Sequence, residues 1–198
     1  MRRLLLALVF ITMTVPIYAE RNCTDHFAED AYSTWTDCTG TRTYAQGSVY
    51  EGDWKDGKRH GVGSMVYHNR DRYEGDWVNG QKTGVGTYRW ANGNKYVGDY
   101  INGKRTGAGS FYWAKGDRYV GDYVDGKRTG YGTLFWSSGK KYEGTFVSGK
   151  RTGQGTYFWA SGTRYVGEFV DGIRSGRLLT NSMPRRSAKL SVAIRATR

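Results

Sequence analysis

A unit of 23 residues recurs along most of this chain, and one column of tyrosines marks its register. Five complete units fill residues 50–164, a sixth begins at Tyr165 and loses the pattern after Gly176, and residues 40–49 supply only the second half of a unit. A residue type that recurs at a fixed period is explained first by the needs of the repeat fold and not by a catalytic role. Function is therefore expected to depend on the surfaces of the array. The column consists of Tyr50, Tyr73, Tyr96, Tyr119, Tyr142 and Tyr165.

Each unit contains two short segments that alternate with period two and are rich in aromatic and β-branched residues, which is typical of strands. In the third unit Tyr96, Gly98 and Tyr100 share one face of the first segment. The Asn102-Gly103 pair between the segments is typical of a tight hairpin turn. We therefore predict an all-β fold: an elongated, single-layer antiparallel meander of stacked β-hairpins from about residue 40 to 177, with no closed barrel.

Glycine recurs beside the aromatic residues of these segments, although it normally weakens a strand. Gly98, between two tyrosines, leaves room for a ring from a neighbouring strand to lie against bare backbone. We predict that aromatic columns stack from unit to unit and form the core, at about 0.5 to 1.5 kcal/mol per ring pair beyond area burial. Two further columns are Tyr44, Tyr67, Trp90, Trp113, Trp136 and Trp159, and Trp54, Trp77, Tyr100, Tyr123, Phe146 and Phe169.

The recurring pattern Tyr-Xaa-Gly-Asp-(Trp/Tyr)-Xaa-Xaa-Gly-Lys-Xaa-Xaa-Gly-Xaa-Gly resembles the MORN repeat (membrane occupation and recognition nexus). The resemblance covers roughly residues 40–176, with five full units in register. It implies a twisted sheet of hairpins without catalysis of its own, used for scaffolding, dimerisation and binding of acidic phospholipids. Related repeats are attached to lipid kinases, so an exported effector or an accessory subunit of an enzyme on another chain is a further alternative.

Residues 1–19 have the features of a secretory signal peptide. Arg2 and Arg3 are followed by an apolar run from Leu4 to about Val15, which is short for a bilayer span, and the segment ends at Ala19. We expect cleavage after Ala19, and retention as an uncleaved anchor is the alternative. Both interpretations predict an exported protein, in the periplasm or secreted, or associated with the outer side of a membrane.

The two cysteines, Cys23 and Cys38, lie in a segment (20–39) that precedes the first full unit. In an oxidising compartment they can form a disulfide, which would tie this cap segment to the exposed first edge of the sheet. Closing a loop of about 15 residues contributes about 3 kcal/mol in the chain-entropy model. Metal binding is a poorer interpretation, because structural zinc requires four closely spaced ligands and only His26 lies nearby.

The formal net charge is +12, and the positive charge of the repeats is concentrated in their hairpin loops. Each unit adds two strands of about 4.8 Å, so equivalent loops stand about 10 Å apart and form a basic stripe. The stripe either attracts an anionic surface such as phospholipid head groups, or keeps an aromatic-rich edge soluble and deters pairing with other sheets. It consists of Lys58, Arg59, Lys104, Arg105, Lys127, Arg128, Lys150 and Arg151.

Beyond the repeats, residues 178–198 carry five basic side chains and no acidic one. This basic tail is either a short helix that caps the last hairpin or a disordered segment, since the terminal units of a repeat array need covering.

No catalytic constellation or metal cluster emerges from the sequence, so we predict neither enzyme activity nor a cofactor. Carboxylates such as Asp99 recur beside basic residues, which favours cross-strand ion pairs over a hydrolytic site. A near-match to a P-loop at 98–105 has arginine where the Mg²⁺-binding Ser/Thr should follow the lysine. Aromatic residues interleaved with basic ones can stack nucleobases, but export argues against a nucleic-acid partner.

The sequence thus supports a non-enzymatic scaffold or protein-interaction module of the cell envelope or secretory space, with an unidentified protein partner or self-association. The alternative is a peripheral membrane protein that binds acidic phospholipids through the basic hairpin loops. The two hypotheses differ in what contacts the loops, which a vesicle-binding measurement can distinguish.

Overall fold

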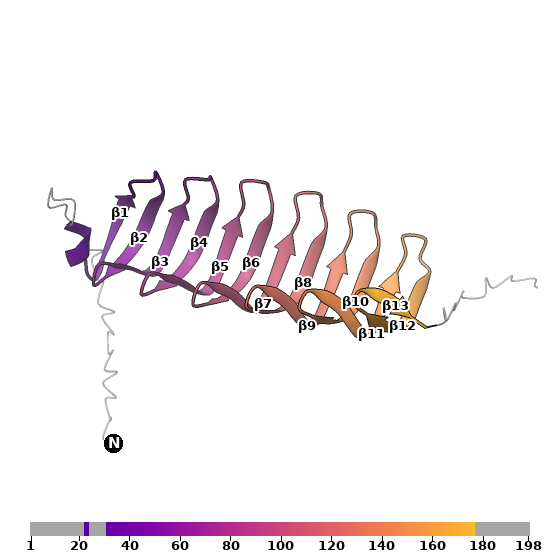
Figure 1. The fold of residues 1–198 in the computed structure, drawn as a ribbon. Helices are drawn as coiled ribbons and strands as arrows, with labels where there is room; N and C mark the ends of the chain where they lie inside the picture. Colours follow the sequence, from indigo (N-terminus) through magenta and orange to yellow (C-terminus); the bar gives the residue numbers. More distant parts are fainter. Residues whose placement is uncertain (1–21, 24–30, 177–198) are drawn as a thin grey trace, which may run out of the picture.

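The computed structural model describes residues 22–23 and 31–176, so the predicted signal peptide at 1–19 and the basic tail at 178–198 lie outside the described residues. A single antiparallel sheet of 13 strands runs along the molecule, and its strand order follows the sequence order. The sheet is elongated and open, with β1 and β13 at opposite ends (Figure 1). The predicted all-β meander of hairpins is therefore confirmed.

A short 3-10 helix, η1 (Ala31–Thr34), precedes the sheet. A complete unit contributes one strand of seven residues and one of nine, as β6 and β7 do. The strands are β1 (Cys38–Thr43), β2 (Val49–Lys55), β3 (Lys58–Val66), β4 (Arg72–Val78), β5 (Gln81–Arg89), β6 (Lys95–Ile101), β7 (Lys104–Tyr112), β8 (Arg118–Val124), β9 (Lys127–Phe135), β10 (Lys141–Val147), β11 (Lys150–Phe158), β12 (Arg164–Val170) and β13 (Ile173–Ser175).

Two kinds of turn connect the strands. Within a unit, a two-residue turn such as Asn102-Gly103 joins β6 to β7, with φ of 49° and 79°. Positive φ at both positions is the requirement of a type I′ turn, which asparagine and glycine meet at least cost. Between units, Trp113 N–H donates to the Asp117 carbonyl at 3.0 Å, and Gly116 N–H donates to the Trp113 carbonyl at 2.9 Å.

A β-bulge interrupts the pairing within the hairpins. Gly98 pairs with Gly109 and Tyr100 with Arg105, so two steps along β6 correspond to four along β7. The bulge frees the Ala108 N–H, which donates to Asp99 Oδ2 at 2.9 Å. The prediction that Asp99 and the equivalent carboxylates form cross-strand ion pairs was wrong, since Asp99 makes none in the described part of the chain. The reason is that the backbone amide left unpaired by the bulge needs an acceptor, and the Asp99 carboxylate is adjacent to it.

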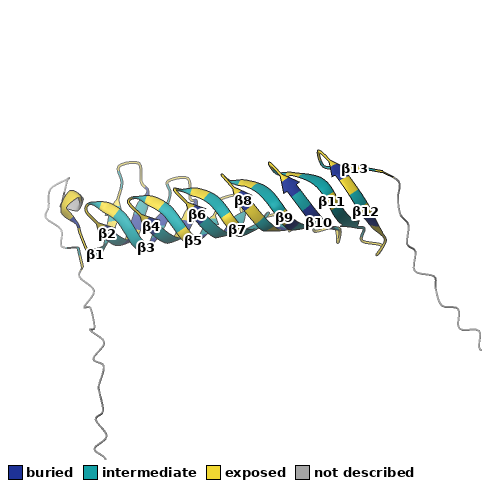
Figure 2. Cartoon of the chain, turned by 90° about the horizontal axis from the view of Figure 1, so that it is seen from below, coloured by how far each residue is buried: buried dark blue, intermediate teal, exposed yellow. Residues whose placement is uncertain are grey.

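The marker tyrosines form the centre of the core. Tyr96 is 0 % exposed, and its hydroxyl donates to the Asp99 carbonyl at 3.1 Å. Its ring lies flat against the neighbouring strand, where a Cβ on Gly109 would stand 2.6 Å from Tyr96 Cε2. Bare backbone is therefore required beneath each ring. The alternating colours along the strands in Figure 2 show this one-sided burial.

The aromatic columns interlock instead of stacking separately. The Tyr96 ring contacts Tyr100 of its own unit at 5.4 Å and Tyr123 of the next at 5.2 Å, with interplanar angles of 89° and 84°. Trp90, which is half-buried, lies between Tyr88 at 4.5 Å and Phe111 at 5.2 Å. Equivalent rings stand about 10 Å apart and cannot touch, so rings of different columns fill the interval edge-to-face or tilted.

A cap segment packs against the first edge of the sheet. Trp35 is 7 % exposed, contacts the Trp54 ring at 5.1 Å edge-to-face, and accepts a hydrogen bond at its carbonyl from Gly57 N–H at 2.8 Å. Cys23 and Cys38 are joined by a disulfide. Cys23 N–H also donates to the Thr39 carbonyl at 2.9 Å, so the segment that contains it is tied to β1 twice.

Candidate interaction surfaces

The structure places the two residues of each Lys-Arg pair of the basic stripe in different surroundings. Lys127 is exposed at the start of β9, whereas Arg128 is half-buried. The Arg128 guanidinium carbon lies 5.3 to 5.6 Å from the centres of the Trp113, Tyr119 and Phe146 rings. Burial lowers the pKa of Arg128 from its ordinary value, which reflects the partial desolvation of its charge.

Each of these arginines clamps the hairpin turn of the next unit. Arg128 Nη2 donates to the Gly149 carbonyl at 2.9 Å, and Gly149 N–H donates to the Arg128 carbonyl at 2.8 Å. Two hydrogen bonds, one charge-assisted, thus join neighbouring units at their turns. Arg59, Arg105 and Arg151 make the equivalent guanidinium bonds to Gly80, Gly126 and Gly172.

The alternation along the strand contains the signal for this arginine role. Arg105 has the same parity as Gly107, Gly109 and Phe111, so it belongs to the aromatic face of β7. The pairing of Arg105 with Tyr100 places it there. The prediction that Arg105 is a loop residue, made because Arg105 adjoins the turn, was therefore wrong. Half of the basic stripe is therefore engaged within the repeat array.

We predict that the two members of a Lys-Arg pair differ in their effect on stability. Arg128→Ser removes a charge-assisted hydrogen bond and ring contacts, and should lower the free energy of unfolding by about 2 kcal/mol. Lys127→Ser should change it by less than about 0.5 kcal/mol, because in the described residues Lys127 makes no ion pair. Urea denaturation measures both, and equal effects would contradict the clamp.

The exposed lysines lie beside a row of aliphatic side chains. Lys104 pairs with Asp125 at 3.2 Å and Lys150 with Asp171 at 3.0 Å, both in exposed positions. Across the turn Ile101 pairs with Lys104, and the equivalent position is aliphatic in five consecutive units. We name these residues, which are 45 to 56 % exposed, the outer aliphatic row: Val78, Ile101, Val124, Val147 and Val170.

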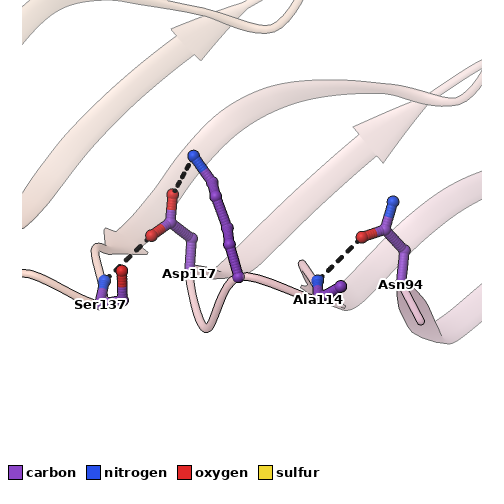
Figure 3. A network of polar contacts seen from close by, with 5 residues as sticks. Asn94, Ala114, Asp117 and Ser137 are labelled. Carbon is purple, nitrogen blue, oxygen red and sulfur yellow. Dashed lines mark hydrogen bonds and ion pairs between the residues drawn. The ribbon is translucent and has the colours of Figure 1, made fainter. Parts of the chain in front are cut away.

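A second set of contacts joins consecutive units at the opposite turns. Asp117 Oδ1 accepts the Ser137 N–H at 3.0 Å, and Asn94 Oδ1 accepts the Ala114 N–H at 2.9 Å (Figure 3). Asp117 is only 6 % exposed, and the Ser137 amide is the main cause of its lowered pKa. Lys115 adds an ion pair at 3.0 Å. These acceptors form a chain of clasps between units.

The clasp acceptor is replaced at one equivalent position. Asp71 Oδ1 accepts the Ala91 N–H at 2.8 Å, and Ser48 Oγ accepts the His68 N–H at 3.1 Å. The next position after Asp117 in this register is Lys140, whose ammonium has no acceptor atom. The junction that follows Lys140 therefore lacks the clasp of the earlier junctions.

Within residues 22–23 and 31–176, no three histidine, cysteine or acidic side chains gather in a way that could hold a metal ion. No helix in the same residues has the length and apolar character needed to cross a membrane.

An open array of interlocked hairpins, with clamps and clasps between units, defines a β-hairpin repeat protein. The chain belongs to the MORN repeat family: the MORN repeat matches residues 50–72, 73–95, 96–118, 119–141, 142–164 and 165–177. MORN repeats serve as modules for interaction with proteins or membranes. A comparison with curated proteins found no match.

Similar solved structures are distant. The TCP domain of Drosophila melanogaster SAS-4, in complex with a proline-rich motif of Ana2, has 16 % identity and a TM-score of 0.38, over 65 % of this chain and 77 % of that one. The TCP10 domain of Danio rerio CPAP has 11 % identity and a TM-score of 0.20, over 69 % and 89 %. These values carry no argument about function.

Proposed function

We propose that this MORN-repeat protein is an exported, non-catalytic scaffold that acts through protein contacts, including self-association. The observation that carries the proposal is the outer aliphatic row, in which five exposed aliphatic side chains follow one another from unit to unit. A series of exposed apolar side chains bordered by charged ones is a feature of interaction sites in soluble proteins. At about 10 Å per unit the row is about 40 Å long, which suits contact with another protein along the array.

The charges next to the row favour a protein over a membrane as the partner. Four of the eight basic residues of the stripe are arginines that hold adjacent turns. Lys104 and Lys150 are paired with carboxylates. Only Lys58 and Lys127 remain without an ion pair in the described residues. A partner surface that is apolar with scattered polar groups matches this pattern better than a uniformly anionic one.

Export is supported by the predicted signal peptide at 1–19 and by the Cys23–Cys38 disulfide, since disulfides persist in oxidising compartments. The cell envelope and the secretory space both meet this condition. The role of an accessory subunit for an enzyme on another chain is one form of the same scaffold function, because the contact surface would be the same.

The test replaces three residues of the outer aliphatic row, Ile101, Val124 and Val147, by serine. Self-association of the exported chain is followed by light scattering against concentration, and other partners by crosslinking in the native envelope. We expect the variant to lose at least about tenfold in affinity for itself or in crosslinked product, since each buried aliphatic contributes on the order of 1 kcal/mol.

A matched control replaces three other exposed residues, Val62, Val85 and Tyr131, by serine. This variant loses at least as much exposed apolar surface but leaves the row intact. Equal losses of self-association or crosslinked product in the two triple variants would contradict a specific role of the outer aliphatic row. Self-association and crosslinking at the wild-type level in the row variant would contradict the proposal.

Binding to acidic phospholipids remains the second candidate, because exposed lysines stand directly beside the aliphatic row. A variant with Lys58, Lys104, Lys127 and Lys150 changed to serine keeps the four clamping arginines. If membranes are the partner, wild-type binding to vesicles of anionic lipid should exceed that of this variant by up to about 1 kcal/mol per lysine and fade as salt rises. Equal binding at low salt would exclude this candidate.

A further inference from the structure

A cleft of about 340 Å³ is lined by residues of the fourth, fifth and sixth units. Its volume lies at the lower end of the range of small-molecule sites, about 300 to 1,000 Å³. It includes residues from the connection before β10, from β11 and from the turn before β13. The residues around it are Trp136, Ser138, Lys140, Arg151, Tyr157, Gly172, Ile173 and Arg174.

The charge of this cleft is one-sided, because its residues include three cations and no carboxylate. Arg151 Nη2 donates to the Gly172 carbonyl, and its guanidinium lies 5.5 Å from the Trp136 ring centre and 5.8 Å from that of Tyr157. Burial lowers the pKa of Arg151, and the nearby charge of Arg174 contributes to the shift. An anion in the cleft would relieve this repulsion.

Aromatic rings hold Arg174 in place, and among residues 22–23 and 31–176 its hydrogen-bond donors have no acceptor. Its guanidinium carbon lies 4.8 Å from the Trp159 ring centre and 5.6 Å from that of Tyr157. In the described residues no carboxylate or carbonyl accepts a hydrogen bond from it. Stacking on rings fixes the plane of a guanidinium while leaving its donors to bind an oxyanion.

Lys140 is the residue that departs from the repeat. Its position holds the clasp acceptor in the earlier units, as Asp117 does with the Ser137 amide (Figure 3). Replacement of an acceptor by a lysine removes a junction hydrogen bond and also adds positive charge to the cleft. The loss of this hydrogen bond does not stabilise the repeat array, so the repeat fold does not explain why a lysine stands at position 140.

We propose that the cleft of Lys140, Arg151 and Arg174 binds a phosphate monoester. The Arg174 guanidinium presents forked donors suited to a phosphate group, and Arg151 adds its charge and the donors that its bond to the Gly172 carbonyl leaves over. The lysine supplies a third positive charge for the second negative charge of the phosphate. The half-buried Trp136 and Tyr157 beside them offer apolar contact to the esterified group. This site is separate from the outer aliphatic row, so its test is independent of the scaffold function.

Isothermal titration of the full exported chain tests the site with glucose 6-phosphate, and with glucose as the uncharged comparison. We expect the wild type to bind glucose 6-phosphate and not glucose. Lys140→Asp should weaken binding by at least about tenfold, because it replaces a cation by an anion. The variant should stay folded, since aspartate restores the acceptor used in two earlier units. Arg174→Gln should give a loss of similar size.

Lys127→Asp is the matched control, because it changes the net charge equally at an exposed position outside the cleft. It should alter the affinity by less than about twofold, since exposed charges beyond a Debye length are screened. Absence of glucose 6-phosphate binding to the wild type, or equal losses in Lys127→Asp and Lys140→Asp, would overturn the proposal. If short-chain phosphatidate binds more tightly than glucose 6-phosphate, the natural ligand is a lipid phosphate monoester. If glucose 6-phosphate binds more tightly, the natural ligand is a soluble phosphate monoester.

Discussion

The protein is expected to unfold steeply as the pH rises above about 10, because about half of its buried core residues are tyrosines. Burial raises the pKa of these phenols, with Tyr123 at about 12 and most others higher. In the unfolded chain a tyrosine ionises near pH 10. The tyrosines with raised pKa values are Tyr50, Tyr67, Tyr73, Tyr88, Tyr96, Tyr100, Tyr119, Tyr123 and Tyr142.

The sign follows from proton binding. Above pH 10 the folded state retains protons that the unfolded state has lost, so the free energy of unfolding falls as pH rises and the loss continues through the folded-state pKa values. Each phenol contributes about 1.4 kcal/mol per pH unit. Four of them combine 0 % exposure with a strongly raised pKa: Tyr50, Tyr73, Tyr96 and Tyr119. Together they remove about 5 kcal/mol per pH unit, which is comparable to the whole stability of a typical domain.

Circular dichroism and phenolate absorbance, recorded together during an alkaline titration, measure this loss. We expect most phenolate absorbance to appear in the same narrow interval as the loss of β-structure, near pH 11. Ionisation of all the tyrosines at pH 10 with the sheet intact would show that the rings are accessible and would contradict the packing described above.

Truncation of one marker tyrosine should have the largest effect among single substitutions at the surfaces and core discussed above. Tyr96→Ala removes a ring that is 0 % exposed and contacts Tyr100 and Tyr123. It also removes the hydroxyl that donates to the Asp99 carbonyl next to the bulge. Replacement of a buried aromatic by alanine costs about 3 to 5 kcal/mol, which is a large fraction of the stability of a domain.

Tyr112→Ala is the matched control within the same hairpin. Tyr112 is half-buried on the other face of β7, where Lys95 Nζ lies 4.3 Å from its ring centre. The same chemical change there should cost about 1 kcal/mol, mostly a cation–π contact and partial burial. Equilibrium denaturation of both variants gives the comparison, and equal losses would mean that the two faces of the sheet are equally packed.

Periodicity was sufficient to predict the fold because every unit repeats the same local rules. Alternating aromatic and glycine residues define strands with one packed face, and Asn-Gly or Asp-Gly pairs define type I′ turns. Neighbouring units then pair in sequence order, since such short turns permit only antiparallel neighbours. The Cys23–Cys38 disulfide was predicted on a different ground, the position of both cysteines at the exposed first edge of the sheet after a signal-like segment.

Bulges and contacts between units could not be read from the sequence. The alternation along β7 places Arg105 on the aromatic face, but its bond to the Gly126 carbonyl of the next unit could not be read from its position next to a turn. The bulge gives Asp99 a backbone amide as its partner in place of a basic side chain. Which hydrogen-bonding groups a bulge leaves unpaired is not specified by register alternation alone.

The sequence by itself determined the repeat, the strands, the turns and the identity of the core residues, because these depend on periods of two and 23 residues along the chain. Only the tertiary structure decided which charges are free. Contacts between units bind the arginines to adjacent turns, leave the outer aliphatic row exposed, and bring Lys140, Arg151 and Arg174 around one cleft. The physical reason is that each of these contacts joins residues of different strands or units, whose partners are fixed by packing between hairpins.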